Sequence, residues 1–402
     1  MDNGSEEFDV CIIGGSLAGN YLCYLLSTSG LKIAVIEEHT DIGKPLQCAG
    51  IVSKKIKKLI DLTEDIIIHK VKVAKLISPS GKSILLSGDE EPLIIDRVGL
   101  DKHFYNLVAH LPHIHYFLGE KFRTFSYITR TEQIKLSITT SKRTIEAKML
   151  IGCDGPLSSV ARSFNLINKV IFASQILIKG KFDKDQAIMY FDSRWKELFG
   201  WIVPEGKDFY RVGLATSKNI FSKFKSFLNM LNLDFEDKVS QQGGIIPYGL
   251  MKKVAFKHVL LLGDSACQVK ATTGGGIIML LTAAEVAAKA IRISFNLNNF
   301  SDKILKLNYE KPCKKLIGIE LKIHYVIRRI LEKFGPNDYD TVFTILKTQH
   351  IEHQISLYGD MDFPKRLISK LLRDGSVLKF LLKFFLHHPK LLGIILLVFL
   401  KN

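Results

Sequence analysis

The segment 14–19 (GGSLAG) near the N-terminus has the composition of a phosphate-binding turn. It lies between an apolar run and a segment with helical spacing, where the free N–H groups and positive end of a helix attract a pyrophosphate. Gly14 and Gly19 match the usual G-x-G-x-x-G pattern, and Ser16 replaces its middle glycine with a small residue whose hydroxyl can bond a phosphate. By itself the loop fits either a dinucleotide or a plain strand-to-helix turn.

A carboxylate stands where a dinucleotide site needs one. Glu37 lies 23 residues after Gly14, at the end of a second apolar run. A carboxylate in this place accepts hydrogen bonds from the hydroxyls of the ribose. Loop, helix, strand and acid together predict a dinucleotide site.

A second glycine-rich segment lies some 250 residues further on. The apolar run Val259–Leu262 leads into Gly263-Asp264, and the segment 272–277 (TTGGGI) opens another helix. Asp264 can bond a ribityl chain, and the run that includes Gly275 and Gly276 lets backbone approach an isoalloxazine edge. The helix dipole then points at the charge of a reduced ring. This pattern favours a flavin over a nicotinamide, with an ordinary glycine-rich loop as the alternative.

Two further motifs lie between these segments. Asp154-Gly155 follows an apolar strand and precedes a helix start, a place from which it can buttress a cofactor domain. Arg97, in the segment 96–101 (DRVGLD), can reach dinucleotide phosphates. A surface ion pair is the alternative for Arg97.

The elements that position these residues follow from hydrophobic spacing. The apolar runs predict two buried parallel strands, Phe8–Ile13 and Lys32–Glu37. The segment between them, Ala18–Ser29, has helical spacing, so the three elements form a βαβ unit. Asp101–Leu111 and Ile277–Ile291 read as further helices. Because the two glycine-rich segments are far apart in the chain, the dinucleotide domain must be discontinuous.

The remaining pattern predicts three regions. Residues 70–96 and 171–215 alternate like antiparallel strands, and the chain is helical from about residue 300. We expect an α/β plus α+β fold of the hydroxylase-like flavoprotein type. It would have a discontinuous, Rossmann-like FAD-binding domain, an inserted antiparallel sheet that binds substrate, and a helical C-terminal region. The expected bounds are 1–69, 97–165 and 255–300 for the first region, 70–96 and 166–254 for the second, and 301–402 for the third.

Composition limits the possible partners. The net charge of +16 attracts anions such as acidic lipid or nucleic acid, although a bias toward lysine gives the same charge, and no nucleic-acid motif accompanies it. The cysteines and histidines lack metal-ligand spacing, so no metal site is predicted, and scattered cysteines favour a reduced, cytoplasmic chain. The acidic N-terminus does not read as a signal peptide, and no G-x-S-x-G elbow points to a serine nucleophile.

The C-terminal segment 376–402 is apolar and basic. Its longest apolar run, Leu391–Leu400, is about half of the roughly 20 residues that span a bilayer. We expect helices that lie on a membrane surface, where Lys379, Lys383 and Lys390 suit anionic lipid. A C-terminal helix buried against the body of the protein is the alternative.

Four segments carry a resemblance to a known family. They are 42–50 (IGKPLQCAG), 199–204 (FGWIVP), 264–277 with its glycine run, and 358–364 (YGDMDFP). In this order and over nearly the full length, the chain resembles the geranylgeranyl reductase family of flavoproteins, and within it the archaeal digeranylgeranylglycerophospholipid reductases. It departs from the family pattern where Phe199 replaces Tyr, Val203 replaces Phe and Ala271 replaces Pro.

The resemblance implies roles for individual residues. FAD contacts carry over to Ala18, Glu37, Cys48, Ala49, Arg97, Asp264, Gly276 and Ile277. Substrate contacts carry over to Phe199, Trp201 and Pro204. Cys48 is expected to face the flavin and to relay a proton, or simply to pack there as a small hydrophobe. For Trp201 the alternative to substrate contact is a place in the core.

The resemblance also implies a reaction. It is the hydrogenation of isolated double bonds in polyprenyl chains, by a proton and a hydride from reduced FAD, at the inner face of the cell membrane. No second nucleotide loop is visible, so the electron donor is external: a ferredoxin, a deazaflavin or NADPH. The alternatives are an FAD-dependent monooxygenase or halogenase of the same fold, and a non-catalytic protein that binds lipid or flavin.

Overall fold

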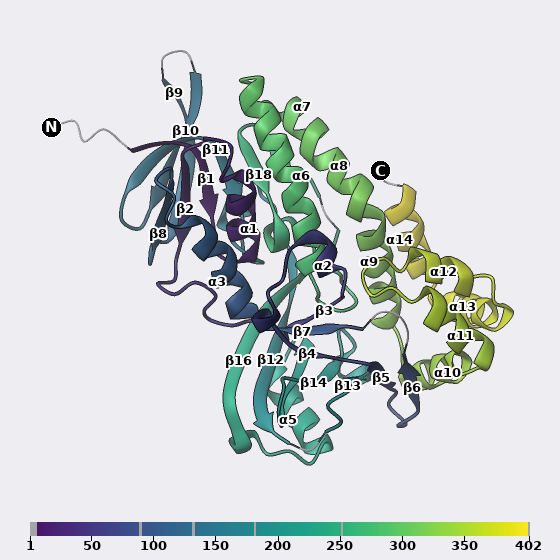
Figure 1. Ribbon diagram of the computed structural model, residues 1–402. Helices are drawn as coiled ribbons and strands as arrows, with labels where there is room; N and C mark the ends of the chain where they lie inside the picture. Colours follow the sequence, from purple (N-terminus) through teal and green to yellow (C-terminus); the bar gives the residue numbers. More distant parts are fainter. Residues whose placement is uncertain (1–5, 88–90, 131–132, 181, 251, 401–402) are drawn as a thin grey trace.

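The computed structural model describes residues 6–87, 91–130, 133–180, 182–250 and 252–400. Figure 1 shows a large sheet with helices α1, α3 and α6, a second sheet next to it, and a group of helices formed by the C-terminal part of the chain. Both predicted glycine-rich segments belong to the first part.

The large sheet is mainly parallel. Its order is β17-β18-β11-β1-β2-β8, with β10 on β11 and β9 on β10. The strands are β1 (Glu6–Ile13), β2 (Ile33–Glu37), β8 (Ile114–Leu118), β9 (Phe122–Arg130), β10 (Gln133–Thr140), β11 (Thr144–Gly152), β17 (Ala255–Phe256) and β18 (Val259–Leu261). The pairs β11-β1, β1-β2, β2-β8 and β11-β18 are parallel. Short apolar runs such as that of β2 form these strands because helices cover them.

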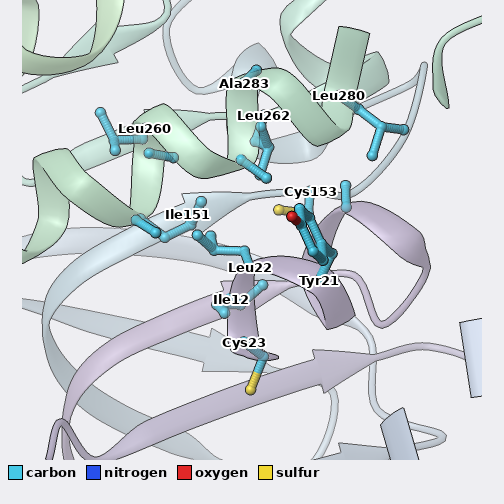
Figure 2. Packing of buried hydrophobic residues seen from close by; sticks show 14 of the residues in the cluster. Ile12, Tyr21, Leu22, Cys23, Ile151, Cys153, Leu260, Leu262, Leu280 and Ala283 are labelled. Atoms are coloured by element: carbon cyan, nitrogen blue, oxygen red, sulfur yellow. The ribbon is translucent and has the colours of Figure 1, made fainter. Parts of the chain in front are cut away.

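Helices from remote parts of the chain pack together on this sheet. They are α1 (Leu17–Leu26), α3 (Arg97–Val108) and α6 (Ile277–Asn296), with the shorter α2 (Ile56–Leu59) and α4 (Ser159–Arg162). Helix α1 contacts both α3 and α6. Figure 2 shows Tyr21 and Leu22 of α1 in one cluster with Leu262 and with Leu280 of α6. The predicted discontinuous domain therefore has a single core.

One predicted helix begins earlier than expected. The segment Asp101–Leu111 was predicted from apolar spacing, but α3 starts at Arg97. The reason is the cap: the Asp96 carboxylate accepts a hydrogen bond of 3.0 Å from the Val98 N–H. This cap fixes the position of Arg97 in the first turn.

The second sheet has the order β16-β12-β15-β14-β13-β5-β6. Its strands are β5 (Val73–Ile77), β6 (Ser83–Leu86), β12 (Lys169–Lys179), β13 (Gln186–Tyr190), β14 (Gly200–Pro204), β15 (Phe209–Thr216) and β16 (Lys238–Tyr248). Helix α5 (Ile220–Met230) covers one face, where Phe224 and Phe227 pack on Ile202 and Val212.

Residues 70–96 form antiparallel strand pairs, as the alternation predicted, but these pairs divide between two sheets. Strands β5 and β6 join the second sheet, where β5 pairs with β13 in parallel. A three-stranded sheet takes the rest, with the order β3-β7-β4 for β3 (Ile51–Val52), β7 (Leu93–Ile95) and β4 (Ile67–Lys70). Alternation within a strand carries no information on its partner. The bounds of the three predicted regions stay predictions.

The C-terminal region is helical. Its α-helices are α7 (Asp302–Leu305), α8 (Lys311–Cys313), α9 (Ile319–Leu331), α10 (Pro336–Leu346), α11 (Gln349–Tyr358), α12 (Lys365–Leu371), α13 (Gly375–His387) and α14 (Pro389–Leu400). Segments 306–310 and 314–318 are π-helical and link α7, α8 and α9. Within the described ranges no single helix has the length and apolarity to span a membrane; α13 and α14 meet those criteria only as a pair bent by 111°.

Candidate functional site

The first glycine-rich loop is pressed against the end of β11. Gly14 has a φ of +104°, and a Cβ there would lie 2.3 Å from the Cys153 carbonyl oxygen. A Cβ on Gly19 would lie 1.9 Å from the Gly14 carbonyl oxygen. Ser16 is the N-cap of α1, and its side chain does not cap the helix. The first N–H groups of α1 thus remain free for an anion, as the predicted pyrophosphate requires.

Glu37 links this loop to the end of β2. Its Oε2 accepts a hydrogen bond of 2.7 Å from the Gly15 N–H, and its Oε1 accepts one of 2.9 Å from the His39 N–H. Residues 38–41 and 44–46, which follow in the chain, line a hollow of about 710 Å³ together with Val98. A hollow beside the acid at the carboxyl end of a parallel strand fits the nucleoside half of a dinucleotide.

Arg97 lies over the loop. Its Nη1 is 2.7 Å from Asp101 Oδ1, and its Nη2 donates to Ser16 Oγ at 3.2 Å. The Arg97 side chain is only 13% exposed, so this is not the surface ion pair left open by the sequence. Burial raises the pKa of Asp101, and the Arg97 guanidinium opposes that shift. Arg97 is therefore held beside the place predicted for the phosphates.

Asp154 supports the loop from below. Its carboxylate accepts hydrogen bonds from the Ser158 hydroxyl at 2.6 Å and the Ser159 N–H at 2.7 Å, which cap α4. Cys153, the residue before Asp154, contacts Gly14. The hydrogen bonds of Asp154 therefore also fix the backbone on which the loop at Gly14 packs. This is the buttressing place that the sequence indicated for Asp154-Gly155.

The second segment meets the first at Gly263. A Cβ on Gly263, whose φ is +73°, would lie 3.3 Å from the Cβ of Ala18 at the start of α1. Asp264 follows, and burial raises its pKa to about 6, against the opposing charge of Arg97. Ala18, Arg97 and Asp264 thus surround one place, although they come from three remote parts of the chain.

The glycine run opens helix α6. Gly274 has a φ of +70°, and the Gly275 carbonyl oxygen accepts a hydrogen bond of 3.1 Å from the Lys270 N–H, which closes the loop. Gly276 is the N-cap and Ile277 the first residue of a 20-residue helix, with no side chain capping it. The Asp264 Oδ1 lies 3.4 Å from where a Cβ on Gly276 would be. These free N–H groups fit the anionic edge of a reduced flavin.

The C-terminal region holds this loop from behind. Lys270 Nζ lies 2.6 Å from Asp362 Oδ1, in an ion pair whose side chains are 5% and 2% exposed. Arg328 donates to the carbonyl oxygens of Ala271 at 2.8 Å and Thr272 at 3.1 Å. His324 contacts the Thr272 hydroxyl at 2.5 Å, and burial lowers the pKa of His324 to about 4.

Sequence reasoning gave none of these residues a role. The segment 358–364 was part of the resemblance, and that was the one available signal for Asp362. Its partner Lys270 lies 92 residues earlier in the chain, a separation that no periodicity reveals.

The Cys48 loop connects this site to the second sheet. The Cys48 carbonyl oxygen accepts hydrogen bonds of 3.1 Å from both Gln175 Nε2 and Arg211 Nη1. Gln175 Oε1 in turn accepts a hydrogen bond of 3.1 Å from Trp201 Nε1. The Cys48 thiol is half-buried and accepts a weak hydrogen bond from the Gly50 N–H at 3.3 Å.

An apolar cluster fills the face of the second sheet opposite α5. Its buried members are Val71, Ile94, Ile171, Ala187, Leu198, Phe199, Trp201, Val203 and Ala215. Ala49 and Ile246 pack against it, and Ile246 lies 3.1 Å from where a Cβ on Gly274 would be. The cluster therefore touches both the Cys48 loop and the glycine run.

Pro204 does not belong to this cluster. It pairs with Tyr210, which packs in the core under α5, and successive strand residues point to opposite faces. Trp201 and Val203 therefore face the apolar cluster, whereas Ile202 and Pro204 face α5. The structure places Phe199 and Trp201 together as predicted for substrate contact, and it separates Pro204 from them.

Comparisons with known proteins fit this geometry. The chain is 28% identical to an uncharacterized protein of Methanocaldococcus jannaschii, over 92% of this chain and 96% of that protein. It is 27% identical to digeranylgeranylglycerophospholipid reductase 1 of Methanococcoides burtonii, over 85% of this chain and 88% of that one. The chain matches no protein-family model. The resemblance to digeranylgeranylglycerophospholipid reductases is confirmed.

Solved structures confirm the predicted fold class. A geranylgeranyl bacteriochlorophyll reductase-like protein of Thermoplasma acidophilum superposes with a TM-score of 0.81 at 21% identity, over 95% of this chain and 100% of that one. The p-nitrophenol 4-monooxygenase of Pseudomonas putida gives a TM-score of 0.67 at 14% identity, over 88% and 97%. The fold is thus the hydroxylase-like fold that the sequence led us to expect.

Proposed function

We propose that this chain is an FAD-dependent reductase that hydrogenates isolated C=C bonds in the geranylgeranyl chains of membrane ether lipids or their precursors. One observation carries the proposal: the apolar cluster lies against the Cys48 loop, at Ala49, and against the glycine run, at Gly274. An apolar chain held there lies beside the place of a flavin ring. The names of the archaeal relatives support this class of substrate.

The chain offers a complete set of contacts for FAD. The loop at Gly14, Ser16 and Gly19 would hold the pyrophosphate with Arg97, and Glu37 would hold the ribose. Asp264 and the free N–H groups at the start of α6 would hold the ribityl chain and the ring. The glycines are needed where a Cβ would collide with backbone, as at Gly14 and Gly19.

Isolated trisubstituted alkenes are not polarised, so hydride addition requires a proton as well. When bound and reduced, the flavin supplies a hydride. The apolar cluster, above all Phe199 and Trp201, would hold the alkene flat and exclude water.

We assign the proton to the Cys48 thiol. Its S–H bond breaks, a C–H bond forms at the less substituted alkene carbon, and the hydride completes the tertiary carbon. Solvent then returns a proton to the thiolate that remains. An external donor, which is a ferredoxin, a deazaflavin or NADPH, returns the two electrons.

We also propose that the chain works in the cytoplasm at the inner face of the cell membrane. Leu378, Leu382 and Leu386 are exposed at four-residue spacing along α13. Exposed Lys379 and Lys383 flank them on the same helix. Each leucine that enters lipid gains roughly 1.5–3 kcal/mol, and each lysine near anionic lipid about 1 kcal/mol.

The test is a lipid assay. The protein is reduced with dithionite under anaerobic conditions and incubated with an unsaturated digeranylgeranylglycerol phospholipid, and the lipid is analysed by mass spectrometry. We expect a gain of two hydrogen atoms for each reduced bond, and no gain with unreduced protein. NADPH oxidation coupled to oxygen uptake, with the lipid unchanged, would support a monooxygenase instead.

A further inference from the structure

A cationic groove lies on helix α12. It encloses about 510 Å³ between α12, α9 and the turn before α12, and Lys365, Arg366, Lys370 and Arg373 line it. Two carboxylates, Glu320 and Asp360, also line it. The groove is separate from the glycine-rich loops described above.

The four cations outnumber the two carboxylates of the groove, of which Glu320 attracts Lys365 through space. In the described ranges, no carboxylate lies within ion-pair distance of any of them. Of the two carboxylates in the groove, Asp360 is paired with Lys55 at 2.9 Å, and Glu320 accepts a hydrogen bond from the Lys365 backbone N–H at 3.1 Å. The groove therefore keeps an excess of positive charge.

Part of this charge is held in place. The Arg366 guanidinium lies 4.6 Å and the Lys370 ammonium 5.2 Å from the centroid of the Tyr358 ring. Stacking on an aromatic face positions a cation without neutralising it. Lys365 and Arg373 are exposed. Two cations held on the ring and two further cations around the same hollow suit a phosphate, whose oxygens accept several charge-assisted hydrogen bonds.

The groove adjoins the helices proposed to contact lipid. Helix α12 packs on α9, and α14 packs on α9 as well (Figure 1). Arg373 lies two residues before α13, whose exposed leucines begin at Leu378. An anionic headgroup in the groove would thus belong to a lipid whose chains are near those leucines.

The groove is also close to the flavin side of the protein. Asp360 and Phe363 line it, and Asp362 between them pairs with Lys270 behind the glycine run. A lipid anchored by its headgroup here would be held next to the wall of the proposed reaction site.

We propose that this groove binds the phosphate headgroup of an anionic membrane lipid and so orients the protein on the membrane surface. The inference rests on the proposed lipid substrate. The occupant is a lipid and not a soluble phosphate compound, because Arg373 of the groove lies two residues before α13, whose leucines are exposed.

The experiment compares two double variants. Lys365→Gln with Arg373→Gln removes two charges from the groove, and Lys218→Gln with Lys225→Gln removes two exposed charges near α5. Flavin-loaded proteins are sedimented with phosphatidylcholine vesicles, with or without phosphatidylglycerol. Bound flavin absorbance and melting temperature report folding.

We expect wild type to prefer the vesicles that contain phosphatidylglycerol. The groove variant should bind these vesicles about 30-fold more weakly than wild type, since each lost charge weakens binding about fivefold. The control variant should bind them no more than threefold more weakly. Equal losses in both variants would overturn the proposal, since only total charge would then matter. Release by millimolar glycerol phosphate at constant ionic strength would also overturn it, in favour of a soluble ligand.

The readout is independent of catalysis. If wild type hydrogenates detergent-dispersed lipid but binds both kinds of vesicle equally, the headgroup site is refuted and the proposed reductase activity is supported. Wild type that binds through the groove but never hydrogenates lipid refutes the reductase alone.

Discussion

The buried ion pair between Lys270 and Asp362 should be essential for holding the glycine run in place. At 2.6 Å and an effective dielectric constant of about 20, the attraction is about 6 kcal/mol. Much of that is offset by the cost of taking both charges out of water. Removal of one partner leaves the other buried and unpaired, which costs about 3–5 kcal/mol.

The variants are Lys270→Met, Asp362→Asn and their combination. We expect each single change to lower the free energy of unfolding by about 3–5 kcal/mol and to weaken flavin binding, because the ion pair ties the loop before α6 to the segment 358–364. The double variant leaves no unpaired charge. Its loss in the free energy of unfolding should therefore be smaller than the sum of the two single losses, by about 2 kcal/mol or more. Urea unfolding followed by circular dichroism, and flavin release followed by fluorescence, measure the two effects.

A nearby ion pair provides the matched control. Lys55 and Asp360 also join the segment 358–364 to the body, at 2.9 Å, but their side chains are 26% and 25% exposed. Lys55→Met and Asp360→Asn should each cost about 1 kcal/mol or less. The reasoning is refuted if the buried and the half-buried pair respond alike, or if the two changes at the buried pair are simply additive.

Three further predictions concern single residues. Cys48→Ala should keep its flavin and lose about 10²–10⁴-fold in lipid reduction, with Cys48→Ser in between; unchanged turnover by lipid mass spectrometry would end the proton-donor role. Gly19→Ala should weaken flavin binding about tenfold or more, because its Cβ would lie 1.9 Å from the Gly14 carbonyl oxygen. Gly375→Ala, which has open space around it, is the control and should bind flavin normally. Equal flavin titration curves for the two variants would contradict this. Burial lowers the pKa of His324 to about 4 in the folded protein, against about 6.5 in the unfolded chain. The neutral ring therefore keeps its full contribution to the free energy of unfolding above pH 6.5, and this contribution is lost as the pH falls toward 4. Melting curves should show a weaker loss over that range for His324→Gln, and an identical pH dependence would refute the assignment.

Local patterns in the sequence were enough to predict the dinucleotide half of the fold. The βαβ unit around Gly14 and Glu37 depends on spacing within 30 residues, and strands and helix lie close to the predicted positions. The discontinuous domain followed from two similar signals far apart. Its physical basis is the packing of α6 on α1.

Long-range contacts could not be predicted in this way. Nothing in the segment 96–101 showed that Arg97 would be buried on Ser16, because that contact depends on how α3 packs against α1. Strand alternation did not reveal which sheet β7 joins or that β5 pairs in parallel with β13. The motif around Trp201 identified a strand, but only the register showed that Pro204 faces away from Trp201.

The most direct test of the account is a single-turnover measurement. Protein with fully reduced flavin is mixed anaerobically with the geranylgeranyl lipid in a stopped-flow spectrometer, and flavin absorbance is followed while the lipid is quenched for mass spectrometry. The account predicts that the flavin is reoxidised by the lipid alone, with one double bond reduced for each flavin. A flavin that stays reduced until oxygen enters would contradict it.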